Sequence, residues 1–259
     1  MNNILVITSI VLRELVRRKD AYVLLIITVL LTLLSGSVNF FGDLRMVRYM
    51  KELCLLLVWI STIVIAVTMT ARQIHAERES RTLFSLLSKP VSRNELILGK
   101  FFGCWLACGV TLLVFYGFFI VTAVSRGESW RLLEYFQAFW LHWVMLGVIV
   151  SMVLCGALVF TAPSSNATIN IVIIVGILML GRHLGKLALH MGEPAQSVVL
   201  AIFYAMPHLE FYDLRDLIIH DWPLVKWSAI GLATLYGAAY AAALLGGACF
   251  LFQRKPLNT

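Results

Sequence analysis

The sequence predicts an all-α polytopic membrane protein, and three observations support this fold class. Hydrophobic residues make up 60% of the chain and charged residues 14%, whereas soluble domains usually hold about 45–50% and about 25%. The mean hydropathy is +0.88. Apolar runs of roughly 20 residues, the length that a spanning helix needs, recur along the whole chain. We therefore expect a single transmembrane domain over residues 1–259.

The first segment, 4–18, is expected to form an amphipathic helix that lies in the membrane interface. At helical periodicity its polar residues gather on one side and its apolar residues on the other. The polar side holds Ser9, Arg13, Glu14 and Arg17, and the apolar side holds Leu5, Val11, Leu12, Leu15 and Val16. Such a helix keeps its arginines among water and headgroups while its apolar face enters the acyl region.

Six spanning helices are expected after this segment. The apolar runs cover residues 21–37, 52–71, 99–124, 138–162, 168–185 and 227–252. The fifth is the weakest, and it either is short or continues as an amphipathic helix to about His190. Six spans place both termini on one side, where lysine and arginine are denser in the loops, so we expect cytoplasmic termini in a plasma membrane of the bacterial inner-membrane kind. We interpret the net charge of +7 as a result of this lysine and arginine bias, which orients the chain in the membrane. No nucleic-acid partner is expected, because the basic residues are spread over several short segments and form no single patch.

A charged insert at 72–100 separates the second and third spans and carries an apolar stripe of its own. Four large apolar residues follow helical spacing: Leu83, Phe84, Leu86 and Leu87. A stripe beyond the membrane needs a partner surface. The insert is therefore expected to hold a short cytoplasmic helix and not only a solvated loop.

Stop and start signals bracket that short helix. Pro90 disfavours helical geometry in the residue before it, so the helix should end there. Ser92 and Glu95 match a capping box, with Ser92 at the N-cap and Glu95 three residues later. We expect a new helix to begin at Ser92 and to continue into the third span.

This insert resembles the coupling-helix loop of ABC-2-type transporter permeases. The matching positions are Glu77, Glu79, Thr82, Leu83, Leu86, Leu87, Ser88, Pro90, Ser92, Arg93, Glu95, Gly99 and Lys100. Arg81 departs from the pattern, because the family often has glycine there. A second stretch, MPHLEFYDLRDLIIH at 206–220, together with a last span that closes in FLFQRKPL, resembles the branch named for multicopper-enzyme maturation, which includes the nitrous-oxide reductase maturation permease.

The resemblance implies a permease subunit of an ATP-driven exporter. Two permease subunits pair in that family, most simply as a homodimer here, and each docks a separate ATP-binding subunit that holds ATP and Mg. The segment 77–93 would be the docking region of this chain. Its expected contact residues are Leu83, Phe84, Leu86 and Leu87 in the buried part, Glu77, Glu79, Arg81 and Arg93 at the rim, and Thr82, Ser88 and Pro90 beside them.

No catalytic residue, cofactor or metal site is expected in the chain itself. It contains no G-x-x-x-x-G-K-[S/T] segment, so we do not expect it to hydrolyse ATP. An intramembrane enzyme is disfavoured because the spans contain no paired acids or His/Glu motif. The rival interpretation is a non-transporting adaptor or sensor that recruits a cytoplasmic partner through the 77–93 helix.

Three further features leave alternatives open. Arg182 and Lys186, at the outer end of the fifth span, are expected either to contact anionic headgroups or an anionic substrate, or to snorkel. The segment 186–226 is expected to be an external loop and a candidate surface for a periplasmic or other external partner. Its acids and histidines, among them His208, Glu210 and Asp213, could suggest a metal site, but their spacing matches no standard ligand pattern, so they are interpreted as surface residues. Aromatic residues near span ends, including Tyr135 and Trp143, are interpreted as an interfacial belt.

Overall fold

The computed structural model describes residues 3–17, 22–23, 26–27, 29–30, 43–79, 92–125 and 131–254. Within these residues the secondary structure is helical and contains no β-strand. The elements are α1 (Asn3–Arg17), α3 (Asp43–Glu79), α5 (Arg93–Ser125), α6 (Leu132–Val159), α7 (Pro163–Ala188), α8 (Ala195–Ala205), the 3-10 helix η1 (Leu209–Tyr212), α9 (Arg215–Ile219) and α10 (Trp227–Arg254).

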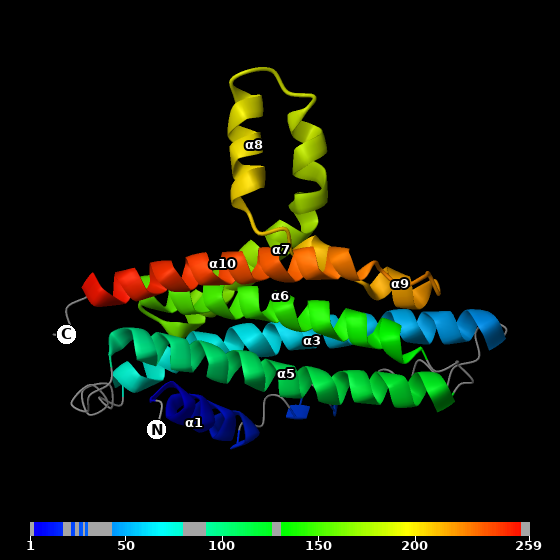
Figure 1. Ribbon diagram of the computed structural model, residues 1–259, viewed down its shortest axis with the longest axis horizontal. Helices are drawn as coiled ribbons and strands as arrows, with labels where there is room; N and C mark the ends of the chain where they lie inside the picture. The colour runs from blue at the N-terminus through cyan, green and yellow to red at the C-terminus, as the bar shows by residue number, and fades with distance from the viewer. Residues whose placement is uncertain are drawn as a thin grey trace.

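Four long helices, α3, α5, α6 and α10, run side by side and form a bundle, and α1 lies against one end of it (Figure 1). We call this the α1 end; there α3 and α10 finish and α5 begins. The opposite end, where α9 lies beside the first turns of α3 and α6, is the α9 end. The helix α6 lies at the centre, because it contacts α3, α5, α7 and α10.

Five helices of the described part are long and apolar enough to cross a membrane. These segments are Arg48–Ala76, Arg93–Ser125, Leu132–Val159, Pro163–Gly181 and Trp227–Arg254. They correspond to the second to sixth expected spans. The first expected span, 21–37, lies outside the described residues apart from three short pairs. The observed helices are mostly longer than the apolar runs because polar residues at their ends continue the helical backbone.

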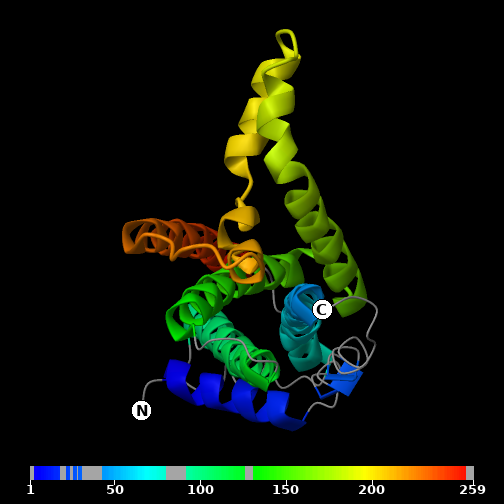
Figure 2. The same cartoon turned by 90° about the vertical axis from the view of Figure 1, so that its right-hand side faces the viewer.

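The fifth of the expected spans is extended at both ends. It starts at Pro163, which occupies the first turn of α7, where a missing N–H costs nothing. The helix then continues to Ala188, so the longer of the two expected alternatives holds. The second half of α7 and α8 form a hairpin that projects away from the bundle (Figures 1 and 2).

The segment 186–226 is folded and returns to the bundle. It comprises the end of α7, α8, η1 and α9, and its residues Leu209, Tyr212 and Leu217 are buried. The glycines of the α7 pattern Gly181-x-x-x-Gly185 allow close packing at the base of the hairpin. A Cβ at Gly181 would lie 2.6 Å from the Glu210 carboxylate, and one at Gly185 would lie 3.2 Å from the Phe203 ring.

Two interpretations of the sequence are wrong: the interfacial belt for two aromatic residues, and surface exposure for three polar residues of the segment 186–226. Tyr135 is only 3% exposed, and Trp143 packs against Trp105 of the neighbouring helix, so neither belongs to an interfacial belt. His208 is 8% exposed and stacks on aromatic rings, and Glu210 and Asp213 are mostly covered. These three are therefore not simple surface residues, because the segment that carries them folds back onto α6 and α10.

Candidate functional site

The first turn of α5 fixes where the chain re-enters the bundle after residues 80–91. The Ser92 backbone N–H donates to Glu95 Oε2 at 2.7 Å, and the Glu95 N–H donates to Ser92 Oγ at 3.2 Å. These two reciprocal hydrogen bonds are those of a capping box, and they satisfy two N–H groups that no helical carbonyl can reach. The position at which α5 begins is therefore defined by local chemistry.

The next residue, Arg93, ties this turn to the C-terminal end of α10. Its guanidinium donates to the carbonyls of Phe252 (2.7 Å) and Gln253 (3.1 Å). The Gln253 side chain in turn donates to Asn94 Oδ1 at 3.1 Å. The last carbonyls of a helix lack intrahelical partners, and a cation there also complements the helix dipole. Arg93 thus caps α10 from the first turn of α5.

The helix α1 packs on the same part of α5 through two glycines. A Cβ at Gly99 would lie 2.8 Å from the Ile7 Cβ, and one at Gly103 would lie 2.6 Å from the Val11 Cβ. Because neither glycine has a side chain, the two backbones approach closely enough for Thr8 Oγ1 to donate to the Gly99 carbonyl at 3.3 Å. The Gly99-x-x-x-Gly103 pattern therefore serves a specific helix contact.

A buried polar chain joins three helices at the α1 end. Lys100 Nζ donates to Gln73 Oε1 at 3.0 Å, and Gln73 Nε2 donates to Glu14 Oε2 at 3.3 Å. Lys100 and Gln73 are 4% and 3% exposed. Burial of a charged and an amide side chain costs free energy unless their hydrogen bonds are made, so this chain fixes the relative positions of α1, α3 and α5.

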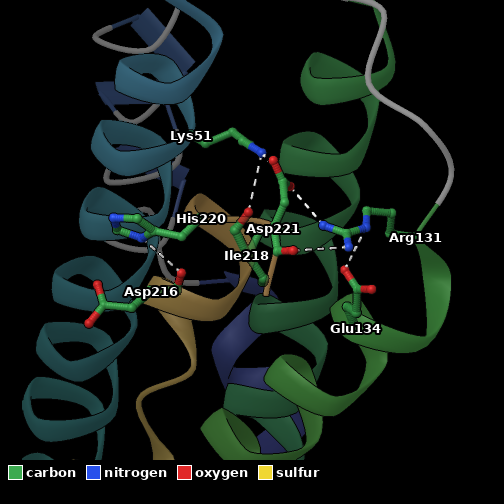
Figure 3. Close-up of polar contacts among 7 residues, drawn as sticks. All are labelled: Lys51, Arg131, Glu134, Asp216, Ile218, His220 and Asp221. Atoms are coloured by element: carbon green, nitrogen blue, oxygen red, sulfur yellow. Dashed lines mark hydrogen bonds and ion pairs between the residues drawn. The ribbon is translucent and has the colours of Figure 1, made fainter. Parts of the chain in front are cut away.

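A second network closes the α9 end of the bundle (Figure 3). The Asp221 carboxylate accepts hydrogen bonds from Lys51 Nζ of α3 at 3.1 Å and from the Arg131 guanidinium, at the start of α6, at 2.7 Å. Lys51 is buried and also donates to the Ile218 carbonyl at 3.2 Å, and Arg131 forms an ion pair with Glu134 at 2.9 Å. One carboxylate therefore holds the segment after α9 against α3 and α6.

His220 adds a contact between the segment after α9 and the start of α3. Its Nδ1 lies 3.0 Å from the Asp216 carbonyl, which can only accept, so Nδ1 carries the proton. The other ring nitrogen, Nε2, lies 2.6 Å from the Arg48 guanidinium and accepts from it.

The segment between η1 and α9 brings an ion pair close to α3. Arg215 donates two hydrogen bonds to the Asp213 carboxylate, both at 2.8 Å, and its guanidinium lies 4.5 Å from the Trp59 ring centroid. The hydrogen bond to Asp213 raises the pKa of Arg215, and the pair is mostly covered. Asp213 and the aromatic face together stabilise the half-buried cation.

The sequence-predicted site residues fall partly outside this description. Glu77 and Glu79 lie on the last turn of α3 but their side chains are outside the described residues, and so are the positions from Arg81 to Pro90. The Arg182 side chain is likewise outside the described residues, and Lys186 is exposed on α7. In the described part of the chain, no three His, Cys, Asp or Glu residues gather where they could hold a metal ion.

A protein-family model matches most of the chain. The model of the family described as "ABC-2 family transporter protein" matches residues 48–257, which include the five helices of the described residues that are long enough to span a membrane. No curated protein matches the chain. The helices and the family agree on a multi-pass membrane protein, and the length of the match shows that the chain belongs to the ABC-2 family of transporter proteins.

Proposed function

We propose that this chain is the permease subunit of an ATP-driven ABC exporter. The family match over 48–257 carries the proposal, because ABC-2 permeases work with an ATP-binding partner. ATP and Mg would be bound by that separate subunit. The segment 77–93 would dock on it, with the apolar residues Leu83, Phe84, Leu86 and Leu87 covered and the charged residues Glu77, Glu79 and Arg81 at the rim. Arg93 was also expected at the rim, but its guanidinium is engaged with the Phe252 and Gln253 carbonyls.

The contacts at the α1 end supply a route for coupling. The docking segment is bounded by the end of α3 and the start of α5, so any displacement acts first on these two helices. The hydrogen-bonded chain of Lys100, Gln73 and Glu14 links α3 and α5 to α1. Arg93 links α5 to α10. A closure of the ATP-binding subunits would thus move four helices together as a rigid body and not one helix alone.

We also propose the orientation, the pairing and the branch. The denser lysine and arginine residues support an orientation in which the α1 end and both termini would lie in the cytoplasm of a bacterial inner-membrane protein, with the α9 end outside. Two copies would pair, each with one ATP-binding subunit.

The stretch 206–220, which forms η1 and α9, supports the multicopper-enzyme maturation branch. It would also offer a surface for a periplasmic partner. Arg182 and Lys186 would contact anionic headgroups or substrate.

The test is co-purification of the tagged chain from its native membrane, followed by ATPase measurement in the isolated complex. An ATP-binding subunit should accompany the wild-type chain, and the double variant Leu83→Asp/Leu86→Asp should lose it. Ser9→Asp, an exposed position on α1 at the same end, is the matched control and should retain it. If no ATP-binding subunit accompanies the wild type, the exporter proposal fails; a subunit that binds without transport would favour the adaptor.

A further inference from the structure

A cleft of about 270 Å³ lies between α5, α6 and α10 in the bundle. The indoles of Trp105 and Trp140 form one side of it. The other side is the face of α10 from Thr234 to Leu245, which is built mostly from glycine and alanine. Small residues on α10 leave space that the neighbouring helices do not fill.

The polar atoms of the cleft wall are already used within the protein. Trp105 Nε1 donates to the Trp143 carbonyl at 2.9 Å, and Trp140 Nε1 donates to Thr234 Oγ1 at 3.0 Å. Thr234 Oγ1 donates in turn to the Ile230 carbonyl at 2.8 Å. A polar ligand would lose its hydration in this cleft without gaining hydrogen bonds from these groups, whereas a hydrocarbon loses nothing. The chemistry of the cleft therefore selects an apolar occupant.

The shape of the cleft is that of a groove along α10. Gly237, Ala241 and Leu245 follow one another at one-turn intervals on the lining face. From Thr234 to Leu245 the helix rises roughly 16 Å at 1.5 Å per residue. This length is close to half of the about 30 Å hydrocarbon thickness of a bilayer, so the groove is about as long as one extended acyl chain.

The mouth of the groove faces sideways, out of the bundle. Ala238 and Ala242 are exposed there, and on α5 the exposed Phe102 contacts Trp105. The groove lies along the middle of α10, far from both polar ends of that helix. In a membrane-spanning bundle, the medium at this mouth is hydrocarbon.

We propose that this groove is a binding site for one acyl chain of a membrane phospholipid, held lengthwise between α10 and the Trp105 and Trp140 indoles. The chain fills the space left by the small residues of α10 and bridges α10 to α5 and α6. The inference requires only that the bundle spans a membrane and does not depend on ATP coupling or on transport direction.

The test uses the full chain in nanodiscs of phosphatidylcholine that carries a diazirine near the end of one acyl chain. After illumination, peptide mass spectrometry should find adducts concentrated on Trp105, Trp140 and 238–242. Exposed positions on α7, such as Val172, should be labelled severalfold less. Ala242→Trp, which blocks the mouth, should remove most of the groove labelling. Ala243→Trp, its exposed neighbour that does not line the groove, should leave the labelling unchanged.

Several outcomes would overturn the proposal. Uniform labelling of the groove and of α7 would mean ordinary boundary lipid. Groove labelling that survives Ala242→Trp would mean that the chain binds elsewhere. Strong disulfide cross-linking of Ala242→Cys between two copies, with no lipid adduct in the groove, would assign the groove to a second copy. Ala238→Phe, also at the mouth, repeats the test if Ala242→Trp lowers the thermal unfolding temperature.

Discussion

Trp105 of α5 and Trp143 of α6 stack with their ring centroids 4.6 Å apart, and each indole N–H donates to the backbone carbonyl of the other, at 2.9 and 3.1 Å. Each ring also lies over a glycine of the opposite helix. A Cβ at Gly109 would lie 2.6 Å from Trp143 Nε1, and one at Gly147 would lie 3.0 Å from Trp105 Nε1. The same W-x-x-x-G spacing on two helices therefore produces a reciprocal contact that fixes α5 against α6.

Replacement of Trp143 by phenylalanine should destabilise the protein. Phe retains an aromatic ring but removes the hydrogen bond to the Trp105 carbonyl, which lies inside α5, at a cost of about 0.5–1.5 kcal/mol. The measurement is thermal unfolding in detergent, followed by circular dichroism. Trp227→Phe, at an exposed position on α10, is the matched control and should change the midpoint little. Equal midpoints for the two variants would contradict the assigned role of the pair.

Features whose partners are close in sequence could be predicted from it. The capping residues Ser92 and Glu95 are three positions apart, and the second to sixth spans are contiguous apolar runs, so one short window contains all the necessary information. Trp143 could not be placed in this way. An aromatic residue near a span end has the same local pattern whether it meets headgroups or a partner 38 residues away, as here.

The network at the α9 end could not be predicted from the sequence, because its partners are also far apart along the chain. Lys51 and Asp221 are 170 positions apart, and only the return of the chain through η1 and α9 brings them together. The interpretation of His208 as a surface residue is wrong, because polarity alone does not reveal whether a segment between spans folds back onto the spans. Gly109 and Gly147, each one turn after a tryptophan, were visible signals, since glycine in a membrane helix lets a neighbouring helix approach closely.

Gly103→Ala and Gly117→Ala should change stability in opposite directions. At Gly103 the added Cβ meets Val11 at 2.6 Å, so α1 has to shift and the protein should be destabilised. At Gly117 no atom lies within 4 Å, so alanine should stabilise α5 by up to about 1 kcal/mol through its higher helix propensity. Thermal unfolding measures both effects. Limited proteolysis within residues 1–20 should become faster only for Gly103→Ala, and unchanged proteolysis would mean that α1 is held by other contacts.

Asp221→Asn should loosen the α9 end. The substitution removes the charge of the carboxylate that accepts from the buried Lys51. Breaking a fully buried pair costs about 3–5 kcal/mol, but Asp221 is 55% exposed, so we expect about 1–2 kcal/mol. Hydrogen exchange of residues 215–222 should rise with the loss of thermal stability.

A second substitution tests whether the charge of Lys51 causes that loss. Lys51→Met removes the charge and keeps an apolar chain of similar length, so the double variant Lys51→Met/Asp221→Asn should recover much of the stability lost in Asp221→Asn. A further decrease in the double variant would show that the Lys51 contact to the Ile218 carbonyl is the more important one.

Arg93→Ala should separate docking from coupling. Arg93 donates to the Phe252 and Gln253 carbonyls, so its loss uncaps α10 at the α1 end without altering the apolar residues proposed for docking. We expect the ATP-binding subunit to remain bound during purification, while stimulation of its ATPase activity falls severalfold and hydrogen exchange in the last turn of α10 increases. Arg93→Lys keeps the cation but loses the guanidinium whose Nη1 donates to both carbonyls, so it should lie between the wild type and Arg93→Ala. If Arg93→Ala instead releases the ATP-binding subunit and leaves exchange in α10 unchanged, Arg93 acts at the rim of the docking surface, and the link from α5 to α10 is not part of the coupling route.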